Sequence, residues 1–353
     1  MKYLALIALL SIAAVPARAD DPLDPSIANA AVKSAEQGKS KWNVAGAQEA
    51  AVRGAANAPA PAATGSAPSS TAPAGKETTD HILASWAHDC PAIGALRASK
   101  GSPSQKRGIG VSSVVGNAAA IVSNLRSYWY YTWGTKGVSG TTAKFTPMIY
   151  GIGNGNSDVE NNLRELDQLR PLPEFVLAYN EPDLSQKIAP NDKTWTKSYA
   201  PRLPPGVIPV SPASSSVNDW FQEFMKGENA AKFDRVAIHL YEDVQANDPA
   251  AVDKAVADFE RRMKIVEKFK KPVWVTEFGL ATWHATKESP AKFTDAQAAC
   301  FMAQVLPYLE EHAERYAWFS PGPDGKTPLY PTLPDALWNL DGSLTPLGEL
   351  YKQ

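Results

Sequence analysis

Neither sign of charge dominates this 353-residue sequence, in which 35 basic residues stand against 37 acidic ones and the formal net charge is −2. No block of like charges occurs, whereas a protein that binds nucleic acid needs a basic patch to displace counterions from phosphates. We therefore expect no nucleic-acid partner. No apolar run reaches the roughly 20 residues that a membrane-spanning helix requires, so we expect no integral membrane span either.

Cysteine is also scarce, since Cys90 and Cys300 are the only two. Two cysteines are too few for a disulfide-built scaffold or a cysteine-rich zinc site. Whether they form a disulfide or remain two buried free thiols stays open, because nothing in the sequence fixes their separation. Apart from His239, the histidines show no short-range ligand spacing, so we expect neither a metal ion nor an organic cofactor.

Proline and tryptophan are in excess. The sequence holds 29 prolines and 10 tryptophans, whereas the usual proline share of about 5% would give roughly 18 at this length. The prolines predict plentiful loops and turns. Tryptophans that line a groove are typical of proteins that bind flat apolar ligands, among which sugars are the commonest.

The first 19 residues predict a secretory signal peptide. A positive start at Met1 and Lys2 precedes an apolar run over 4–15, and Ala17-Arg18-Ala19 supplies a small-residue cleavage pattern. An uncleaved membrane anchor is the alternative. We expect a secreted or periplasmic protein.

Three segments that differ in amino-acid composition follow. Residues 20–53 are alanine-rich, and a weak helix near 27–36, a small anchor module or plain disorder would fit them. Residues 54–79 are dominated by Ala, Gly, Pro, Ser and Thr and predict a flexible linker. Residues 80–353 are expected to form one globular domain with an N-terminal lead-in and a core over 106–353.

Within this core, β-branched and aromatic runs alternate with helical patterns, which predicts βα repeats and a parallel sheet. Apolar residues at helical spacing predict helices over 249–269, 158–169 and 295–309, the last capped by Asp295 behind Thr294. The predicted strands are 108–112, 127–131, 145–150, 175–180, 207–211, 236–241, 273–278 and 316–319. Eight strands over roughly 240 residues predict an α/β protein with a (β/α)8 TIM barrel. A doubly wound open sheet is the alternative, but it needs a glycine-rich turn after the first strand, and Gly108 and Gly110 fall inside a strand.

Two glutamates stand at the ends of predicted strands four and seven. Glu181 lies in Y-N-E-P-D, where the following proline predicts an extended backbone, and Glu277 lies in V-W-V-T-E-F. Active sites of parallel barrels form at the C-terminal ends of the strands. Two carboxyl groups that meet there supply what glycoside hydrolysis requires, one as an acid and the other as an ionised partner of the developing oxocarbenium charge.

His239 and Tyr241 alternate with Leu240 on predicted strand six, so their side chains point to the same side. If that side faces the barrel mouth, Tyr241 can hold the carboxylate of Glu277, and His239 can bind substrate or a carboxylate. A histidine and a tyrosine satisfied within the core are the alternative.

Several tryptophans fall at or just beyond predicted strand ends, namely Trp129, Trp133, Trp283 and Trp318. A pyranose offers an apolar C–H face that can stack on indole. We expect Trp129, Trp283 and Trp318 to bind substrate, with core packing as the alternative for each. Trp274 lies within a strand and is assigned to packing.

Short blocks along the chain occur in the order found in a known family. They are K-R-G-I-G-V-S, S-Y-W-Y-Y-T-W-G, F-T-P-M-I-Y-G, Y-N-E-P-D, V-S-P-A-S, I-H-L-Y, V-W-V-T-E-F, R-Y-A-W-F-S and L-T-P-L-G-E-L-Y. Together they resemble glycoside hydrolase family 128, which belongs to a clan of barrel glycosidases with the acid/base on strand 4 and the nucleophile on strand 7. The resemblance runs from about Lys106 to the C-terminus.

The resemblance implies a retaining β-1,3-glucanase, which we expect to be an endo-enzyme. It implies Glu181 as acid/base, Glu277 as nucleophile and Asn180 as a hydrogen-bond partner of the sugar 2-hydroxyl. It also implies that Trp318 forms the floor of the −1 sugar site. The family tends to carry tryptophan where Leu240 stands and glycine where Glu242 stands, so one subsite is expected to differ.

The expected partner is a β-glucan polysaccharide or oligosaccharide, bound by a monomer. Double displacement through a covalent glycosyl-enzyme is the expected mechanism, and it requires carboxyl groups about 5–5.5 Å apart rather than the roughly 6.5–9.5 Å of inverting enzymes. Three alternatives stay open: the same chemistry on another β-glycan such as xylan or mannan, a transglycosylase, and a non-catalytic glucan-binding envelope protein.

Overall fold

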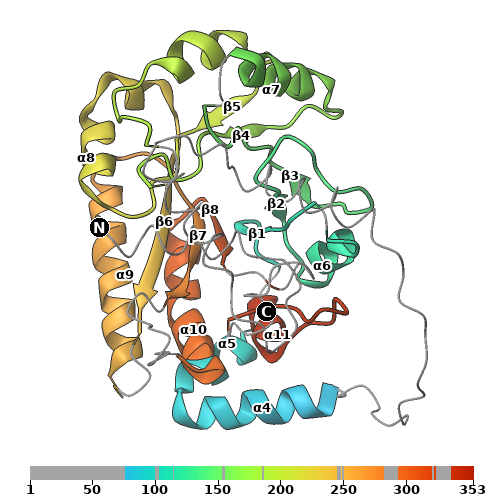
Figure 1. The fold of residues 1–353 in the computed structure, drawn as a ribbon. Coiled ribbons are helices and arrows are strands. Elements are labelled where there is room, and N and C mark those ends of the chain that lie inside the picture. The colour runs from blue at the N-terminus through green and yellow to red at the C-terminus, as the bar shows by residue number, and fades with distance from the viewer. Residues whose placement is uncertain are drawn as a thin grey trace, which may run out of the picture. The chain divides into compact units, whose positions relative to one another are not determined.

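Eight parallel strands form the centre of the structure (Figure 1). They are β1 (Arg107–Gly110), β2 (Trp129–Tyr131), β3 (Lys144–Phe145), β4 (Phe175–Leu177), β5 (Ile208–Val210), β6 (Val236–Asp243), β7 (Val273–Ala281) and β8 (Arg315–Trp318). Each of the eight predicted strands is present, although β1 to β5 are shorter than expected and β6 and β7 are longer.

The computed structural model describes residues 76–99, 103–113, 115–152, 156–184, 187–244, 248, 250–281, 293–319, 322 and 335–353. All of them belong to one compact unit, Ala74–Gly325 with Leu329–Gln353. The expected signal peptide, the segment 20–53 and the linker up to residue 75 lie outside the described residues. Residues 76–79, which we assigned to the linker, are instead helical.

The strands close into a ring. Hydrogen bonding gives one sheet in the order β3-β2-β1-β8-β7-β6 and a second sheet, β4-β5. Parallel bridges join the two sheets on both sides: Met148 pairs with Leu177 of β4, and Val210 of β5 pairs with Arg235 just before β6. The ring confirms the (β/α)8 barrel and excludes the open doubly wound sheet.

The helices cover the outside of this ring. The described helices are α4 (Lys76–Asp89), α5 (Pro91–Ala98), α6 (Ala118–Asn124), α7 (Asn156–Gln168), α8 (Asp219–Lys226), α9 (Ala251–Glu267), α10 (Asp295–His312) and α11 (Pro346–Tyr351), with the short turns η1 (Trp195–Tyr199), η2 (Ala200–Arg202) and η3 (Glu228–Lys232). Helices α7, α9 and α10 confirm the three helical predictions. The cap of α10 is Thr294, which forms a capping box with Gln297, so the assignment to Asp295 is wrong. No described helix combines the length and the apolar character that crossing a membrane needs.

Two apolar clusters share the buried side chains. The inner cluster holds residues of the strands and of the segments that follow them, among them Trp129, Tyr131, Ala237 and Trp274, and it fills the barrel. The outer cluster joins the other faces of the strands to the helices. The inner cluster takes alternate residues of the strands, because neighbouring side chains of a strand point to opposite faces. Trp274 packs as expected.

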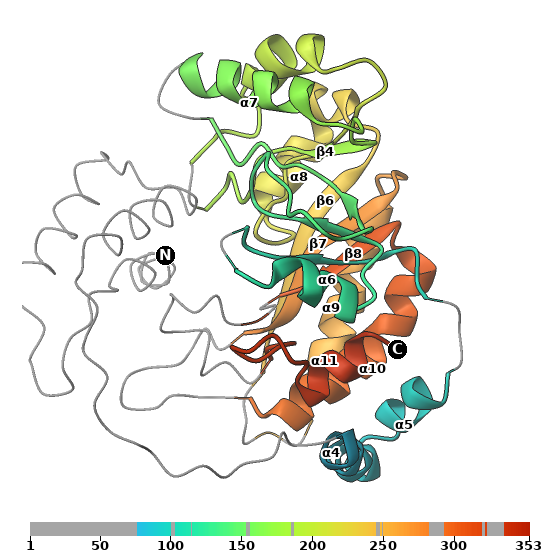
Figure 2. The ribbon, with the colours of Figure 1, turned by 90° about the vertical axis from the view of Figure 1, so that its right-hand side faces the viewer.

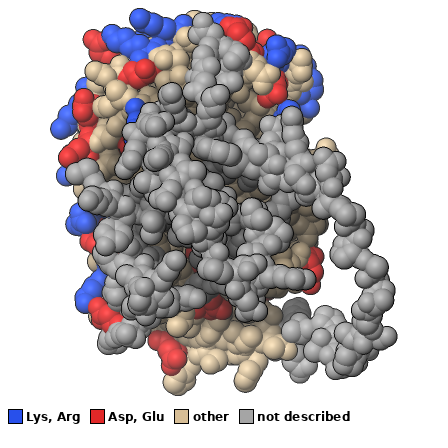
Figure 3. Space-filling view, viewed as in Figure 1, with Lys and Arg blue, Asp and Glu red and all other residues tan. Residues whose placement is uncertain are grey.

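The N-terminal lead-in is fastened to the barrel by a disulfide. Helices α4 and α5 lie beside α10 and α11 (Figure 2), and Cys90, between α4 and α5, is bonded to Cys300 of α10 with the Cα atoms 5.8 Å apart. Of the two alternatives for the cysteines, the structure shows the disulfide. On the described surface visible in Figure 3, basic and acidic side chains are interspersed.

Candidate active site

Glu277 reaches the inside of the barrel through an irregularity in β7. Val275 and Phe278 both pack in the outer cluster although two residues separate them. Ile238 of β6 pairs with Val275, and the next residue of β6, His239, pairs with Glu277. Thr276 is therefore the extra residue of a β-bulge, and the bulge turns Glu277 inward. Without it, strict alternation would direct this carboxylate to the helices.

Both oxygens of the Glu277 carboxylate accept hydrogen bonds. The indole Nε1 of Trp133 donates to Oε1 at 3.0 Å, and the Tyr131 hydroxyl lies 3.3 Å from the same oxygen. The Tyr241 hydroxyl donates to Oε2. The side chain is only 6% exposed. Burial raises the pKa of Glu277 above its usual value, while His239 and the donors Tyr241 and Trp133 oppose that rise by stabilising the ionised form.

Glu181 stands at the end of β4 in a backbone conformation that the sequence did not predict. Its φ is +43°, in the left-handed region, so the expectation of an extended residue before Pro182 is wrong. A tertiary hydrogen bond overrides the local preference, because the Glu181 N–H donates to the carbonyl of Ala213 at 2.8 Å; a local turn bond, from the N–H of Leu184 to the Glu181 carbonyl, accompanies it. Such strain is typical of functional sites. Trp133, with a φ of +55°, shares it.

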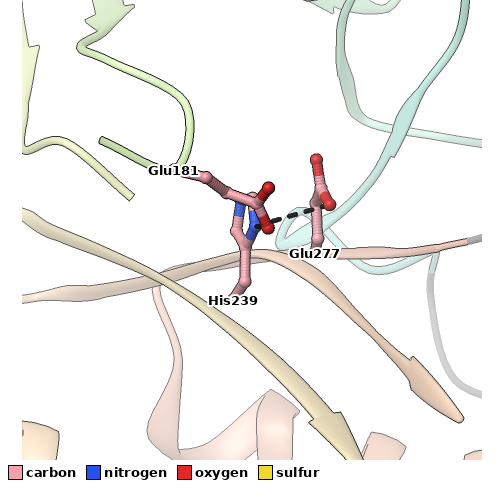
Figure 4. A group of neighbouring side chains, drawn as sticks. All are labelled: Glu181, His239 and Glu277. Atoms are coloured by element: carbon pink, nitrogen blue, oxygen red, sulfur yellow. Dashed lines mark hydrogen bonds and ion pairs between the residues drawn. The ribbon is translucent and has the colours of Figure 1, made fainter. Parts of the chain in front are cut away.

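His239 lies between the two glutamates (Figure 4). Its Nδ1 is 3.0 Å from Oε1 of Glu181 and 3.4 Å from Oε2 of Glu277, and the imidazole is fully buried. Burial lowers the pKa of His239, but the two carboxylates outweigh burial, so the pKa lies above its ordinary value. The histidine thus places a titratable group with a raised pKa between two acids.

One ligand atom from each of Glu181, His239 and Glu277 lies within 4.8 Å of the others, a geometry that could hold a metal ion. The donors around Glu277 argue for another use. The Trp133 indole N–H, which can only donate, holds Oε1, and the Tyr241 hydroxyl donates to Oε2, so a cation would have to share each oxygen with a hydrogen. We assign the cluster to proton chemistry.

Asp183 fixes the turn that carries Glu181. Its carboxylate accepts hydrogen bonds from the backbone N–H of Ser215 at 3.0 Å, from the Ser215 hydroxyl at 2.6 Å and from Nδ2 of Asn218 at 2.6 Å. Asn218 in turn caps α8 by accepting from the N–H of Phe221. The segment that follows β4 is therefore tied to the segment that follows β5.

The structure brings together four of the eight residues that we expected in the site. Glu181, Glu277, His239 and Tyr241 form the cluster described above. Asn180 adjoins it, because it is buried at the tip of β4 and pairs with Ala213. Trp283 lies outside the described residues.

Trp129 and Trp318 are placed elsewhere. Trp129 is 1% exposed, packs on Trp274 in the inner cluster and donates from its indole to the carbonyl of Lys106, before the start of β1. Trp318 is 1% exposed in the outer cluster, where its indole donates to the carbonyl of Asp335. Both rings are buried in packing contacts, which favours core packing, the alternative given for each of them.

Sequence reasoning missed Tyr131 and Phe319 and named Trp133 without a role. Phe319 packs edge-on against the rings of Trp133 and Tyr241, with centroid distances of 6.1 and 5.9 Å. A usable signal was present in W-Y-Y-T-W, because alternate residues of a strand share a face. Gly110 was a second signal, because a glycine within a strand often marks the close approach of another group. In the structure, a Cβ atom on Gly110 would lie 2.7 Å from the Trp133 ring.

A (β/α)8 barrel with one carboxyl group on the segment that follows β4 and a second on β7 has the architecture of barrel glycosidases. The profile of the family described as "Glycosyl hydrolase catalytic core" matches residues 108–351. The match spans more than half of the chain, and the chain belongs to this family. A comparison with curated proteins finds no match.

Solved structures of glycoside hydrolase family 128 share this fold. One is a subgroup I endo-β-1,3-glucanase mutant from Amycolatopsis mediterranei in complex with laminarihexaose, which is 23% identical over 70% of this chain and 99% of its own, with a TM-score of 0.55. Another is a subgroup V exo-β-1,3-glucanase from Cryptococcus neoformans, which is 24% identical over 70% of this chain and 97% of its own, with a TM-score of 0.50. The likeness agrees with the family 128 resemblance of the sequence blocks.

Proposed function

We propose that this chain is a retaining glycoside hydrolase that cleaves β-1,3-glucan from within. The observation that carries the proposal is the approach of Glu181 and Glu277, whose ligand oxygens lie within 4.8 Å of each other. Retaining enzymes hold their carboxyl groups about 5–5.5 Å apart, and inverting enzymes need about 6.5–9.5 Å to admit a water molecule. The approach of one oxygen from each carboxyl group to within 4.8 Å fits the shorter of these two separations.

The surroundings of the two carboxyl groups support different roles. Glu277 is nearly buried and accepts hydrogen bonds from Trp133 and Tyr241, which favour the ionised form that a nucleophile needs. The side chain of Glu181 is 20% exposed, so it can exchange protons with a leaving group and later with water. His239 contacts both carboxylates and stabilises their negative charge.

In the proposed first step, a Glu277 oxygen attacks the anomeric carbon while Glu181 protonates the departing glycosidic oxygen. The C–O bond to the leaving sugar breaks, and a covalent glycosyl-enzyme forms. In the second step, Glu181 accepts a proton from water, and the resulting hydroxide displaces Glu277 from the anomeric carbon. Two inversions give net retention, and the sequence of proton transfers returns both groups to their starting states.

The choice of β-1,3-glucan rests on the sequence blocks shared with family 128, and the two solved structures named above are those of β-1,3-glucanases. One of the two cleaves as an endo-enzyme and the other as an exo-enzyme. We propose endo action by analogy with the former. We further propose export to the periplasm or beyond, because the Cys90–Cys300 disulfide suits an oxidising compartment.

A reducing-sugar assay on curdlan and laminarin, beside xylan and mannan, tests the substrate. Release confined to the two β-1,3-glucans supports the proposal, and release from xylan or mannan only contradicts it. Laminarihexaose then separates the modes of action. Mid-length products indicate endo cleavage, glucose alone indicates exo cleavage, and products longer than the substrate indicate a transglycosylase. Binding of laminarihexaose without any product would identify a glucan-binding protein.

The role of Glu277 is tested by Glu277→Gln, with Glu311→Gln as the matched control because the Glu311 side chain is 81% exposed on α10. We expect Glu277→Gln to lower kcat by about 10⁴-fold or more, as removal of a nucleophile does, and to leave laminarihexaose binding intact. The control keeps full activity. The anomer first seen by NMR reports the stereochemistry: the β-anomer means retention, and the α-anomer would refute it.

A further inference from the structure

A buried ion pair lies behind the active site, on the outer face of β6. Ala237 belongs to the inner cluster, so His239 and Tyr241 share its face, and Leu240 and Glu242 point to the helices. The Glu242 side chain is 3% exposed and contacts the guanidinium of Arg262 on α9, which is 19% exposed. Glu242 therefore does not face the substrate, contrary to the expectation that it changes a subsite.

Arg262 also binds the backbone of a site residue. Its Nη2 donates a hydrogen bond of 2.7 Å to the carbonyl of Tyr241. The N–H of His239 donates to Ser214, on the side of β6 that faces the chain after β5. Since backbone groups alternate along a strand, the Tyr241 carbonyl faces the same side. Among the described residues, Ile238 makes the last bridge between β6 and the chain after β5. Beyond this bridge, Arg262 is the group that donates to the Tyr241 carbonyl.

The buried pair of Glu242 and Arg262 is not explained by a contribution to the stability of the fold. Burial raises the pKa of Glu242 to about 7, while Arg262 opposes this rise and Asp258 adds to it. Apolar residues of the same volume would avoid this unfavourable burial, because buried ion pairs seldom add net stability. The Nη2 group of Arg262, however, carries two hydrogens and contacts both the Glu242 carboxylate and the Tyr241 carbonyl. Glu242 thereby keeps Arg262 aimed at Tyr241.

We propose that Arg262, held by Glu242, is a positioning residue that keeps the Tyr241 hydroxyl on the carboxylate of Glu277. The proposal rests on the proposed function for the role of Glu277 as nucleophile. Neither Arg262 nor Glu242 touches the reacting atoms. They act through the backbone at Tyr241, whose ring is flanked by Phe319 at 5.9 Å between centroids.

The quantity that tests this proposal is the pKa of Glu277, measured through the pH dependence of kcat/KM. The titratable groups that face it are Glu181 from the tip of β4, His239 and Tyr241 from β6, and Tyr131 from β2. A displaced Tyr241 hydroxyl removes a donor to the ionised form, so the pKa of Glu277 rises. The acidic limb of the kcat/KM profile then moves to higher pH. A role limited to fastening α9 would change thermal stability and leave this limb in place.

The experiment compares Arg262→Met, Arg262→Lys and Tyr241→Phe, with Arg261→Met as the control because Arg261 is 62% exposed and pairs with Asp258. We expect Arg262→Met to raise the acidic limb by about one unit and to lower kcat about tenfold at limiting pH, because a hydrogen bond to a charged group is lost. KM on laminarihexaose should change little. Arg262→Lys should shift the limb by a smaller amount, and it keeps the test available if Arg262→Met does not fold.

A double variant decides between positioning and fastening. If Arg262 acts through the Tyr241 hydroxyl, adding Arg262→Met to Tyr241→Phe produces no further shift of the limb. An additive shift, or no shift in the single variants, overturns the proposal. NMR titration of the protein labelled at glutamate Cδ, with Glu277→Gln for assignment, follows the same pKa without substrate. A wild type that cleaves no glucan therefore refutes the proposed function, while the titration still decides this inference.

Discussion

Removal of the Cys90–Cys300 disulfide is expected to destabilise the barrel strongly. The two cysteines are 210 residues apart in sequence, so the bond restricts the unfolded chain over most of the domain. In the chain-entropy description, closing a loop of this length corresponds to about 5 kcal/mol at 25 °C. Native disulfides typically contribute about 2–5 kcal/mol when measured, and we expect the double variant Cys90→Ala/Cys300→Ala to fall at the upper end of that range.

Urea unfolding followed by tryptophan fluorescence measures the loss, and the wild type in dithiothreitol provides a second form of the protein without the disulfide. Both should unfold at a clearly lower urea concentration than the oxidised wild type. Helices α4 and α5 should also become the first part to lose protection against hydrogen exchange, because the bond fastens them to α10. Equal midpoints for the double variant and the oxidised wild type would refute the reasoning.

Three further predictions concern the barrel interior and its mouth. Tyr241→Phe removes a donor that favours ionised Glu277, so the acidic limb of the kcat/KM profile should move to higher pH and kcat/KM should fall about 10- to 100-fold. In Gly279→Ala, the new Cβ would lie 2.0 Å from the Phe319 carbonyl; thermal unfolding should therefore show a Tm lowered by about 4 °C or more. Trp129→Phe should lower Tm without changing KM for laminarihexaose, and a several-fold rise in KM would restore Trp129 to the sugar site.

The fold could be predicted because its signal repeats along the chain. Each of the eight apolar strands and each helix between them was predicted from its own pattern. An error in one element would therefore not have changed the predictions of the others. The two glutamates were found for a related reason. Glu181 and Glu277 are acidic residues at the C-terminal ends of apolar strands, and only the barrel topology brings two such ends together.

The surroundings of the glutamates were harder to predict. Alternation along V-W-V-T-E-F places Glu277 on the outer face, and only the bulge at Thr276 turns it inward. The conformation of Glu181 likewise depends on a hydrogen bond to Ala213, which lies more than 30 residues away. Both features arise from tertiary pairing, which no local rule on proline or strand period contains.

The tryptophans show why composition alone misleads in a parallel barrel. In an antiparallel sheet with one wet face, an aromatic residue on the polar side of the pattern would stand out. Here most strand residues are buried on both faces, so Trp129 on the inner face and Trp318 on the outer face give the same sequence signal as a residue at the mouth. What distinguishes Trp133 is its position along the strand direction: it lies two residues beyond the end of β2, on the face that Trp129 and Tyr131 share. Height along the barrel axis, rather than residue type, separates the site from the core.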